Sequence, residues 1–187
     1  MKSLTFIPCI LLVCTAFALA PQQPSAPAAA SPTPTAGPAA RPGDVDSIDH
    51  ILAAVYDVIS GPAGKRDWDR FRSLFYPGAR LIPSNRNAKG EVAARVLTPE
   101  QYVERGQAVF SKEGFFERSV ANRIESWDHL AHVWSTYESR HAAEDAKPFA
   151  RGINSFQLLY DGSRWWILTI YWEAEDAAHP LPDKYSK

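Results

Sequence analysis

Residues 150–176 constrain the fold more than any other part of the sequence. They form two runs of apolar, aromatic and β-branched residues with Asp161-Gly162 between them. Both residues of an Asp-Gly pair tolerate the positive φ angles of a type I′ turn, so the pattern predicts a β-hairpin. Both faces of this hairpin are largely apolar. We therefore expect helices to cover one face, and further protein or a partner chain to cover the other.

The turn length decides which residues share a face of the hairpin. A two-residue turn places Asn154 opposite Thr169 and Phe156 opposite Ile167. The face that we expect to look inward then carries Asn154, Phe156, Trp165, Thr169 and Tyr171. The outward face carries Trp166, Leu168, Ile170 and Trp172. A three-residue turn would shift the register by one and exchange these faces.

The N-terminus has the pattern of a secretory signal. Lys2 supplies a positive charge, and an uncharged apolar run follows that ends Ala18-Leu19-Ala20. We expect residues 1–20 to be a signal peptide and the mature protein to be periplasmic or secreted, with no stable membrane insertion. A permanent membrane anchor and lipidation at Cys14 are the alternatives, and Pro21 favours cleavage slightly downstream. Cys9 and Cys14 both lie in this segment, so the mature chain has no thiol or disulfide.

Composition divides the remainder of the chain. Residues 21–43 are rich in Pro, Ala, Ser and Thr and are expected to form a disordered linker. Residues 44–176 have the length of one domain, and residues 177–187 read as a polar tail. The formal net charge is −1, and no basic cluster is present. We therefore expect no nucleic-acid partner.

The predicted elements place helices before a sheet. Asp46 and Asp67 are candidate caps for the first two helices, and Thr98-Pro99-Glu100-Gln101 has the capping-box pattern of a third. A short strand is expected at 79–83, followed by a polar loop, and long strands at 115–127, 130–141 and in the final hairpin. This order predicts an α+β domain in which a curved antiparallel sheet packs over the N-terminal helices as a cone.

Two stretches carry a family resemblance. Residues 67–79, DWDRFRSLFYPGA, and the hairpin segment DGSRWWI follow that helix-then-sheet order. The chain resembles the nuclear transport factor 2-like superfamily, SnoaL-like branch, over about residues 46–176. The resemblance implies the cone fold. Such folds host isomerases, dehydratases, hydrolases, ligand binders and dimerisation modules, so it does not imply one chemistry.

Tests for specific chemistry identify no catalytic residue. In ketosteroid isomerase-like members, a tyrosine of the first helix donates to the oxyanion, and Tyr56 lies near that place. Their general base would fall at or beside Pro83, which cannot accept a proton. His129 with His132, and Glu138 with His141, have spacings that point their side chains to opposite faces of a strand. We therefore expect no metal site and no cofactor, and the catalytic residues stay unknown.

Three hypotheses for function follow. The first is an exported domain that binds a small apolar or aromatic molecule in the cone, with a pocket formed by Tyr56, Tyr137, Asn154, Phe156, Trp165, Thr169 and Tyr171. The second is a non-catalytic homodimerisation module that pairs through Trp166, Leu168, Ile170 and Trp172. The third is an isomerase or hydrolase with an acid/base that the sequence does not reveal. A filled cone would favour the second, and a titratable group inside the cone would favour the third.

Overall fold

The computed structural model describes residues 37–186, so the predicted signal peptide and most of the predicted linker lie outside the described residues. The helices are α1 (Pro42–Val45), α2 (Ile48–Ile59), α3 (Trp68–Ser73), α4 (Pro99–Phe110) and the short 3-10 helix η1 (Asp183–Tyr185). The strands are β1 (Phe75–Arg86), β2 (Val92–Ala94), β3 (Phe116–Trp127), β4 (Leu130–Arg140), β5 (Ala150–Tyr160) and β6 (Trp165–Ala174).

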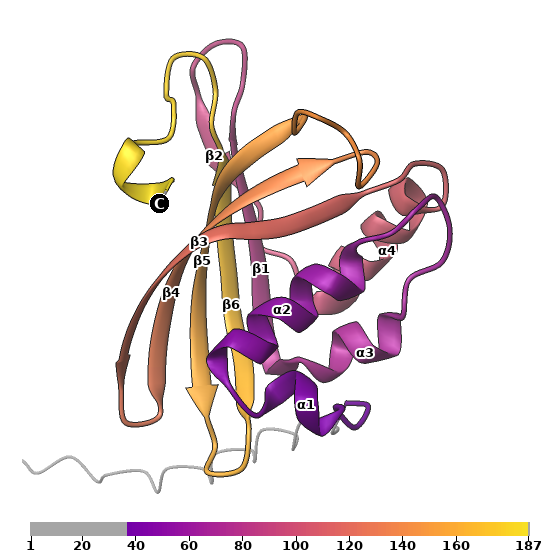
Figure 1. The fold of residues 1–187 in the computed structure, drawn as a ribbon, viewed down its shortest axis with the longest axis vertical. Coiled ribbons are helices and arrows are strands. Elements are labelled where there is room, and N and C mark those ends of the chain that lie inside the picture. The colour runs from indigo at the N-terminus through magenta and orange to yellow at the C-terminus, as the bar shows by residue number, and fades with distance from the viewer. Residues whose placement is uncertain (1–36, 187) are drawn as a thin grey trace, which may run out of the picture. The chain divides into compact units, whose positions relative to one another are not determined.

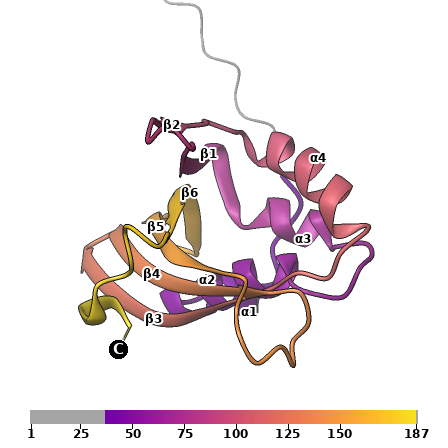
Figure 2. The ribbon, with the colours of Figure 1, turned by 90° about the horizontal axis from the view of Figure 1, so that it is seen from above.

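The six strands form one sheet in the order β2-β1-β6-β5-β4-β3. Figure 2 shows that this sheet is curved and open, with α3 and α4 on one side of it. All neighbours pair antiparallel except β1 and β6, which are parallel. The predicted short strand at 79–83 is therefore part of a longer strand. Part of the predicted polar loop also pairs with β2, which the sequence analysis did not predict.

The helices begin at polar caps because side-chain oxygens satisfy their free N–H groups. Thr98 and Gln101 form the predicted capping box of α4. Asp67 accepts the N–H of Arg70 and caps α3, also as predicted. At α2 the cap is Ser47 and not the predicted Asp46, whose carboxylate instead lies 2.5 Å from the His50 ring.

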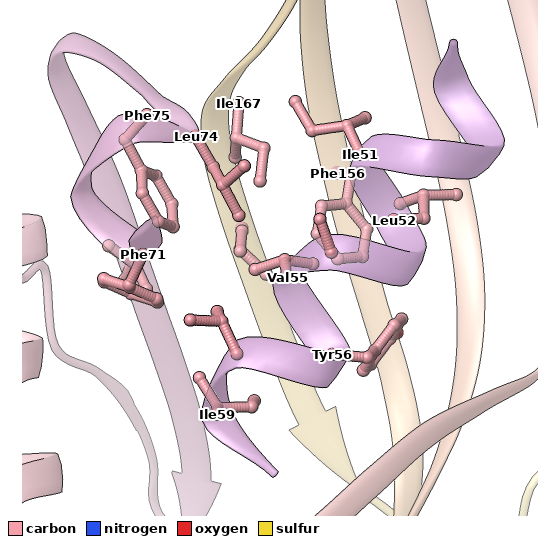
Figure 3. Packing of buried hydrophobic residues seen from close by; sticks show 14 of the residues in the cluster. Ile51, Leu52, Val55, Tyr56, Ile59, Phe71, Leu74, Phe75, Phe156 and Ile167 are labelled. Atoms are coloured by element: carbon pink, nitrogen blue, oxygen red, sulfur yellow. The ribbon is translucent and has the colours of Figure 1, made fainter. Parts of the chain in front are cut away.

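The core lies between α2 and the concave face of the sheet. Figure 3 shows Phe156 of β5 and Ile167 of β6 pointing toward the helices, where they meet the apolar stripe of α2. The fully buried side chains include Ile51, Leu52, Phe71, Leu74, Phe156, Leu158 and Ile167. Burying each such side chain stabilises the fold by roughly 1.5–3 kcal/mol. This packing fixes the position of α2 relative to β4 and β5.

The predicted hairpin is present, but its turn is longer than two residues. Tyr160 pairs with Trp165, which leaves Asp161 to Arg164 as the loop. The Asp161 carboxylate accepts the backbone N–H groups of Ser163 and Arg164, and the Trp166 indole N–H. These bonds hold the pKa of Asp161 well below its usual range. The predicted pairing is wrong by two positions, which changes each partner but leaves the inward face the same near the turn.

A β-bulge at Leu168 then exchanges the two faces of β6. Leu158 pairs with Ile167, but the next residue, Gln157, pairs with Thr169, so Leu168 has no partner of its own. Trp165 and Ile167 face inward before the bulge. Beyond it, the inward residues are Ile170 and Trp172, which pack on the core. The inward placement predicted for Thr169 and Tyr171, and the outward placement predicted for Ile170 and Trp172, are therefore wrong.

The end of the chain lies against the outer face of the sheet (Figure 1, yellow). Thr136 donates a hydrogen bond to the carbonyl of Tyr185, and Arg123 donates to the carbonyl of Lys184. The Tyr185 ring lies 5.7 Å from the Trp134 ring. The segment predicted as a polar tail thus covers part of the outer face.

Candidate functional site

A cavity of about 220 Å³ lies between α2, α4 and the inner face of the sheet. Most of its lining is aromatic or aliphatic. Four polar side chains from different elements also meet in it and make three groups: the pair Tyr56 and Asn154, then Glu117, then Tyr102. The lining residues are Val55, Tyr56, Ile59, Phe71, Leu81, Tyr102, Phe110, Phe115, Glu117, Asn154, Phe156, Ile170 and Trp172. Cavities of this kind, apolar with a few convergent polar groups, are the usual form of small-molecule sites.

Tyr56 and Asn154 form one polar contact of the cavity wall. The Asn154 amide donates to the Tyr56 hydroxyl over 3.0 Å, and that hydroxyl lies 2.7 Å from the Ser135 hydroxyl. Both Tyr56 and Asn154 are buried. Burial raises the pKa of Tyr56, so the phenol keeps its proton at neutral pH. Since these groups bond one another, a ligand would join an existing hydrogen-bond network.

Glu117 of β3 is the second polar group, and sequence reasoning missed it. The Ser139 hydroxyl donates to one carboxylate oxygen over 2.7 Å, and the Asn154 amide lies 3.5 Å from the other oxygen. The Glu117 backbone N–H donates to the Ser60 hydroxyl at the end of α2, which fixes the strand there. Burial raises the pKa of the Glu117 carboxyl to about 7, against the hydrogen bonds from Ser139 and Asn154, which lower it.

The position of Glu117 depends on a second bulge. Counted back from the Asp128-His129 turn, the register would place Arg118 opposite Ser139. A register shift between Ser119 and Ala121 instead places Glu117 there. Ser139 lies two residues beyond Tyr137 and so shares its inward face. The shared inward face of Tyr137 and Ser139 could have pointed to their partners on β3. It does not identify Glu117, because only the bulge brings Glu117 inward and no residue of β3 marks the bulge.

Tyr102 of α4 is the third polar group. Its ring stacks on Phe71 at 5.3 Å, and burial raises the pKa of its hydroxyl. Among residues 37–186, the structure shows no hydrogen bond for this hydroxyl. A phenol proton of Tyr102 is therefore free to bond a molecule in the cavity.

A wider groove opens beside the cavity, and Tyr56 and Glu117 line both spaces. The groove has a volume of about 700 Å³ and lies along α2, β3 and the loop after β4. Its basic residues, Arg118 and Arg140, both bond to Glu138, at 3.3 Å and 2.9 Å. The groove and the cavity therefore meet at Tyr56 and Glu117.

The structure brings only part of the predicted pocket together. Tyr56, Asn154 and Phe156 line the cavity as predicted. Tyr137 is buried against Gly152, and Trp165 packs near Tyr160 at the hairpin end, so neither lines the cavity. Thr169 and Tyr171 lie on the outer face of β6, where Tyr171 is exposed.

The predicted dimer face is also divided. Trp166 lies outward, with the Arg164 guanidinium 3.6 Å from its ring centre and Tyr76 edge-on to it. Leu168 occupies the bulge and is half-buried. Ile170 and Trp172 line the inner cavity and do not belong to an outer surface.

The remaining sequence candidates stay apart. Pro83 pairs with Trp172 on β6, and His132 contacts the Ser155 hydroxyl on the outer face of the sheet. His129 lies in the turn after β3, beside Asp128. Within the part of the chain that the structure describes, no three His, Cys, Asp or Glu residues are grouped as a metal site.

Solved structures match this chain by fold, whereas no protein-family model and no curated protein matches it by sequence. A Nostoc punctiforme protein of unknown function with a cystatin-like fold aligns at a TM-score of 0.53 and 14% identity, covering 70% of this chain and 90% of that chain. Kfla4162 from Kribbella flavida aligns at a TM-score of 0.51 and 12% identity, and the match covers 72% of this chain and 93% of that chain. An NTF-2 like protein of unknown function from Silicibacter pomeroyi aligns at a TM-score of 0.48 and 11% identity, and the match covers 70% of this chain and 94% of that chain.

These likenesses concern the fold alone. The domain is α+β, with a curved, open six-stranded sheet of the cystatin-like kind. The predicted α+β fold class, with a curved sheet over the N-terminal helices, is thereby confirmed. Membership of the nuclear transport factor 2-like superfamily stays a prediction. The SnoaL-like branch stays a prediction.

Proposed function

We propose that this domain binds a small, largely apolar molecule in the inner cavity. The observation that supports the proposal is the cavity, whose volume is about 220 Å³ and in which Glu117, Asn154 and Tyr102 meet among aromatic side chains. Burying apolar ligand surface there supplies affinity, and the polar groups fix the ligand's orientation. A filled core would instead have favoured the interaction module.

A second candidate function is acid/base catalysis of the isomerase or hydrolase type. Glu117 favours it, because a carboxyl with a pKa of about 7 is partly ionised at neutral pH. Such a group suits either donation or acceptance of a proton. Glu117 also lies within the same hydrogen-bond network as Tyr56, through Asn154. No reaction is assigned to it.

Export and self-association complete the proposal. The signal-like residues 1–20 support a periplasmic or secreted protein. Among residues 37–186, none of the helices is long and apolar enough to cross a membrane. Pairing through the outer face of the sheet rests on Trp166 and its surroundings once Ile170 and Trp172 are excluded.

Ligand binding is tested by filling the cavity. Naphthalen-1-ylmethanol, a small aromatic alcohol, is titrated into the protein by isothermal calorimetry. Ile170→Phe adds volume inside the cavity and should abolish binding. The matched control is Ile153→Phe, which makes the same change on the outer face of the sheet. Equal binding by both variants would contradict the proposed site.

A further inference from the structure

The Glu117 carboxylate lacks a cationic partner. Its hydrogen bonds come from Ser139 and Asn154, which are both neutral. Over the described range 37–186, no arginine, lysine or histidine forms an ion pair with it. Holding a half-buried carboxylate without a counter-charge is unfavourable, and a cationic group of a ligand would relieve that cost.

The cavity around Glu117 favours a cation as well. Tyr56, Tyr102, Phe115, Phe156 and Trp172 line it with aromatic rings. The faces of such rings carry partial negative charge and attract ammonium groups, most strongly where water is excluded. The cavity therefore offers an anion and several aromatic side chains to one bound group, with apolar space for the rest of the molecule.

We propose that the ligand is a protonated primary amine with a small aromatic or aliphatic body, its ammonium bound by Glu117. This inference rests on the proposed ligand-binding function and names the ligand's class. The ammonium donates to the Glu117 oxygen that Asn154 approaches at 3.5 Å, because Ser139 already occupies the other oxygen. The body fills the space beside Phe156 and Ile170.

The charges in the groove agree with this choice. The groove that leads to Glu117 carries Asp49, Asp57 and Asp145, of which Asp57 pairs with Arg70, while Arg118 and Arg140 are held by Glu138. This arrangement disfavours an anionic ligand. Inside, the titratable groups that face Glu117 are Tyr56 of α2, Tyr102 of α4 and Tyr137 of β4, and burial raises the pKa of each, so all are neutral.

The assignment of an amine ligand is tested with two compounds that share a naphthylmethyl group and differ only in an amine or a hydroxyl. Naphthalen-1-ylmethylamine and naphthalen-1-ylmethanol are titrated calorimetrically at pH 6 and pH 8, where the amine stays largely protonated, since the pKa of an arylmethylamine lies above about 8. Ionised Glu117 binds the amine, and its free pKa is about 7. Amine affinity should therefore rise about tenfold from pH 6 to pH 8, while alcohol affinity should not rise.

Variants separate the charge from the cavity. Glu117→Gln should abolish the pH dependence and the preference for the amine, and should retain binding of the alcohol. Glu125→Gln, the same change at an exposed position of β3, should bind both ligands as the unchanged protein does. If neither ligand binds the unchanged protein, the proposed function itself fails.

Two other results would overturn the amine assignment alone. One is equal affinity of the unchanged protein for both ligands, and the other is undiminished amine preference in Glu117→Gln. If Glu117→Gln does not fold, carboxyl ¹³C NMR of the unchanged protein decides. The pKa of Glu117 should fall when the amine is added, and an unmoved pKa would contradict the contact.

Discussion

At the scale of single residues, Glu117 shows how a site can oppose stability. Its carboxyl is held inward by Ser139 and Asn154, but burial makes the ionised form unfavourable. The pKa rises from 4.5 to about 7 on folding. Between those values the folded chain holds a proton that the unfolded chain releases, so this group's contribution to stability falls as pH rises through that range.

The loss of stability as Glu117 ionises predicts how a variant without this carboxyl should behave. Glu117→Gln cannot ionise, so it should be more stable than the unchanged protein at pH 8, by about 1–3 kcal/mol. At pH 4 the difference should be close to zero, because the carboxyl is then mostly protonated in both states. Urea denaturation at the two pH values measures it. A variant that is less stable at pH 8 would show that the protein compensates the carboxylate charge.

Residue patterns predicted part of the site and not the rest. Asn154 and Phe156 were identified because strand alternation places them on one face, and Tyr56 was identified by its place on the first helix. Glu117 was not, because a glutamate between Phe116 and Arg118 near a sheet edge reads as a surface residue. Only the pairing with Ser139 brings it inside.

At the scale of elements, bulges decide what the periodicity cannot. The hairpin and the capped helices were predicted because Asp-Gly turns and capping boxes are local chemistry. The bulges near Leu168 and Val120 have no local signature, and each exchanges the two faces of its strand. The parallel pairing of β1 with β6 joins segments that are far apart in the sequence. Local sequence patterns do not predict such a pairing either.

Deleting Leu168 should keep both faces of β6 in place. Leu168 is the extra residue of the bulge, so its removal leaves the pairs on either side unchanged and in ordinary alternation. Ile170 and Trp172 then stay inward, and we expect cooperative urea unfolding with a loss of no more than about 3 kcal/mol. Inserting an alanine after Thr169, the contrasting variant, turns Ile170 and Trp172 outward and should abolish cooperative unfolding. A deletion variant that unfolds without cooperativity would contradict this role of the bulge.

At the scale of the whole described unit, the two faces of the sheet differ in their covering. Helices α2, α3 and α4 lie on the concave side, and η1 lies on part of the other side. The Trp134 indole nitrogen is buried there without a hydrogen-bond partner among residues 37–186. The predicted homodimer would need the part of this face that η1 leaves open.

The assembly prediction now rests on Trp166. If the outer face pairs two copies, Trp166→Asp should give a folded monomer by light scattering, because a charge in an apolar interface is not tolerated. Ile170→Asp is not an equivalent test, since Ile170 is 6% exposed and the change should unfold the domain. A monomeric unchanged protein at high concentration would contradict the homodimer.

The most direct test of the central claim, a ligand cavity bordered by α2, α4 and the sheet, is methyl NMR with titrated naphthalen-1-ylmethylamine. The account predicts saturable shifts at Val55, Ile59 and Ile170, which line the cavity. Ile153, on the outer face, should not shift. Shifts confined to Ile153 and its neighbours, or none at saturating concentration, would contradict the claim.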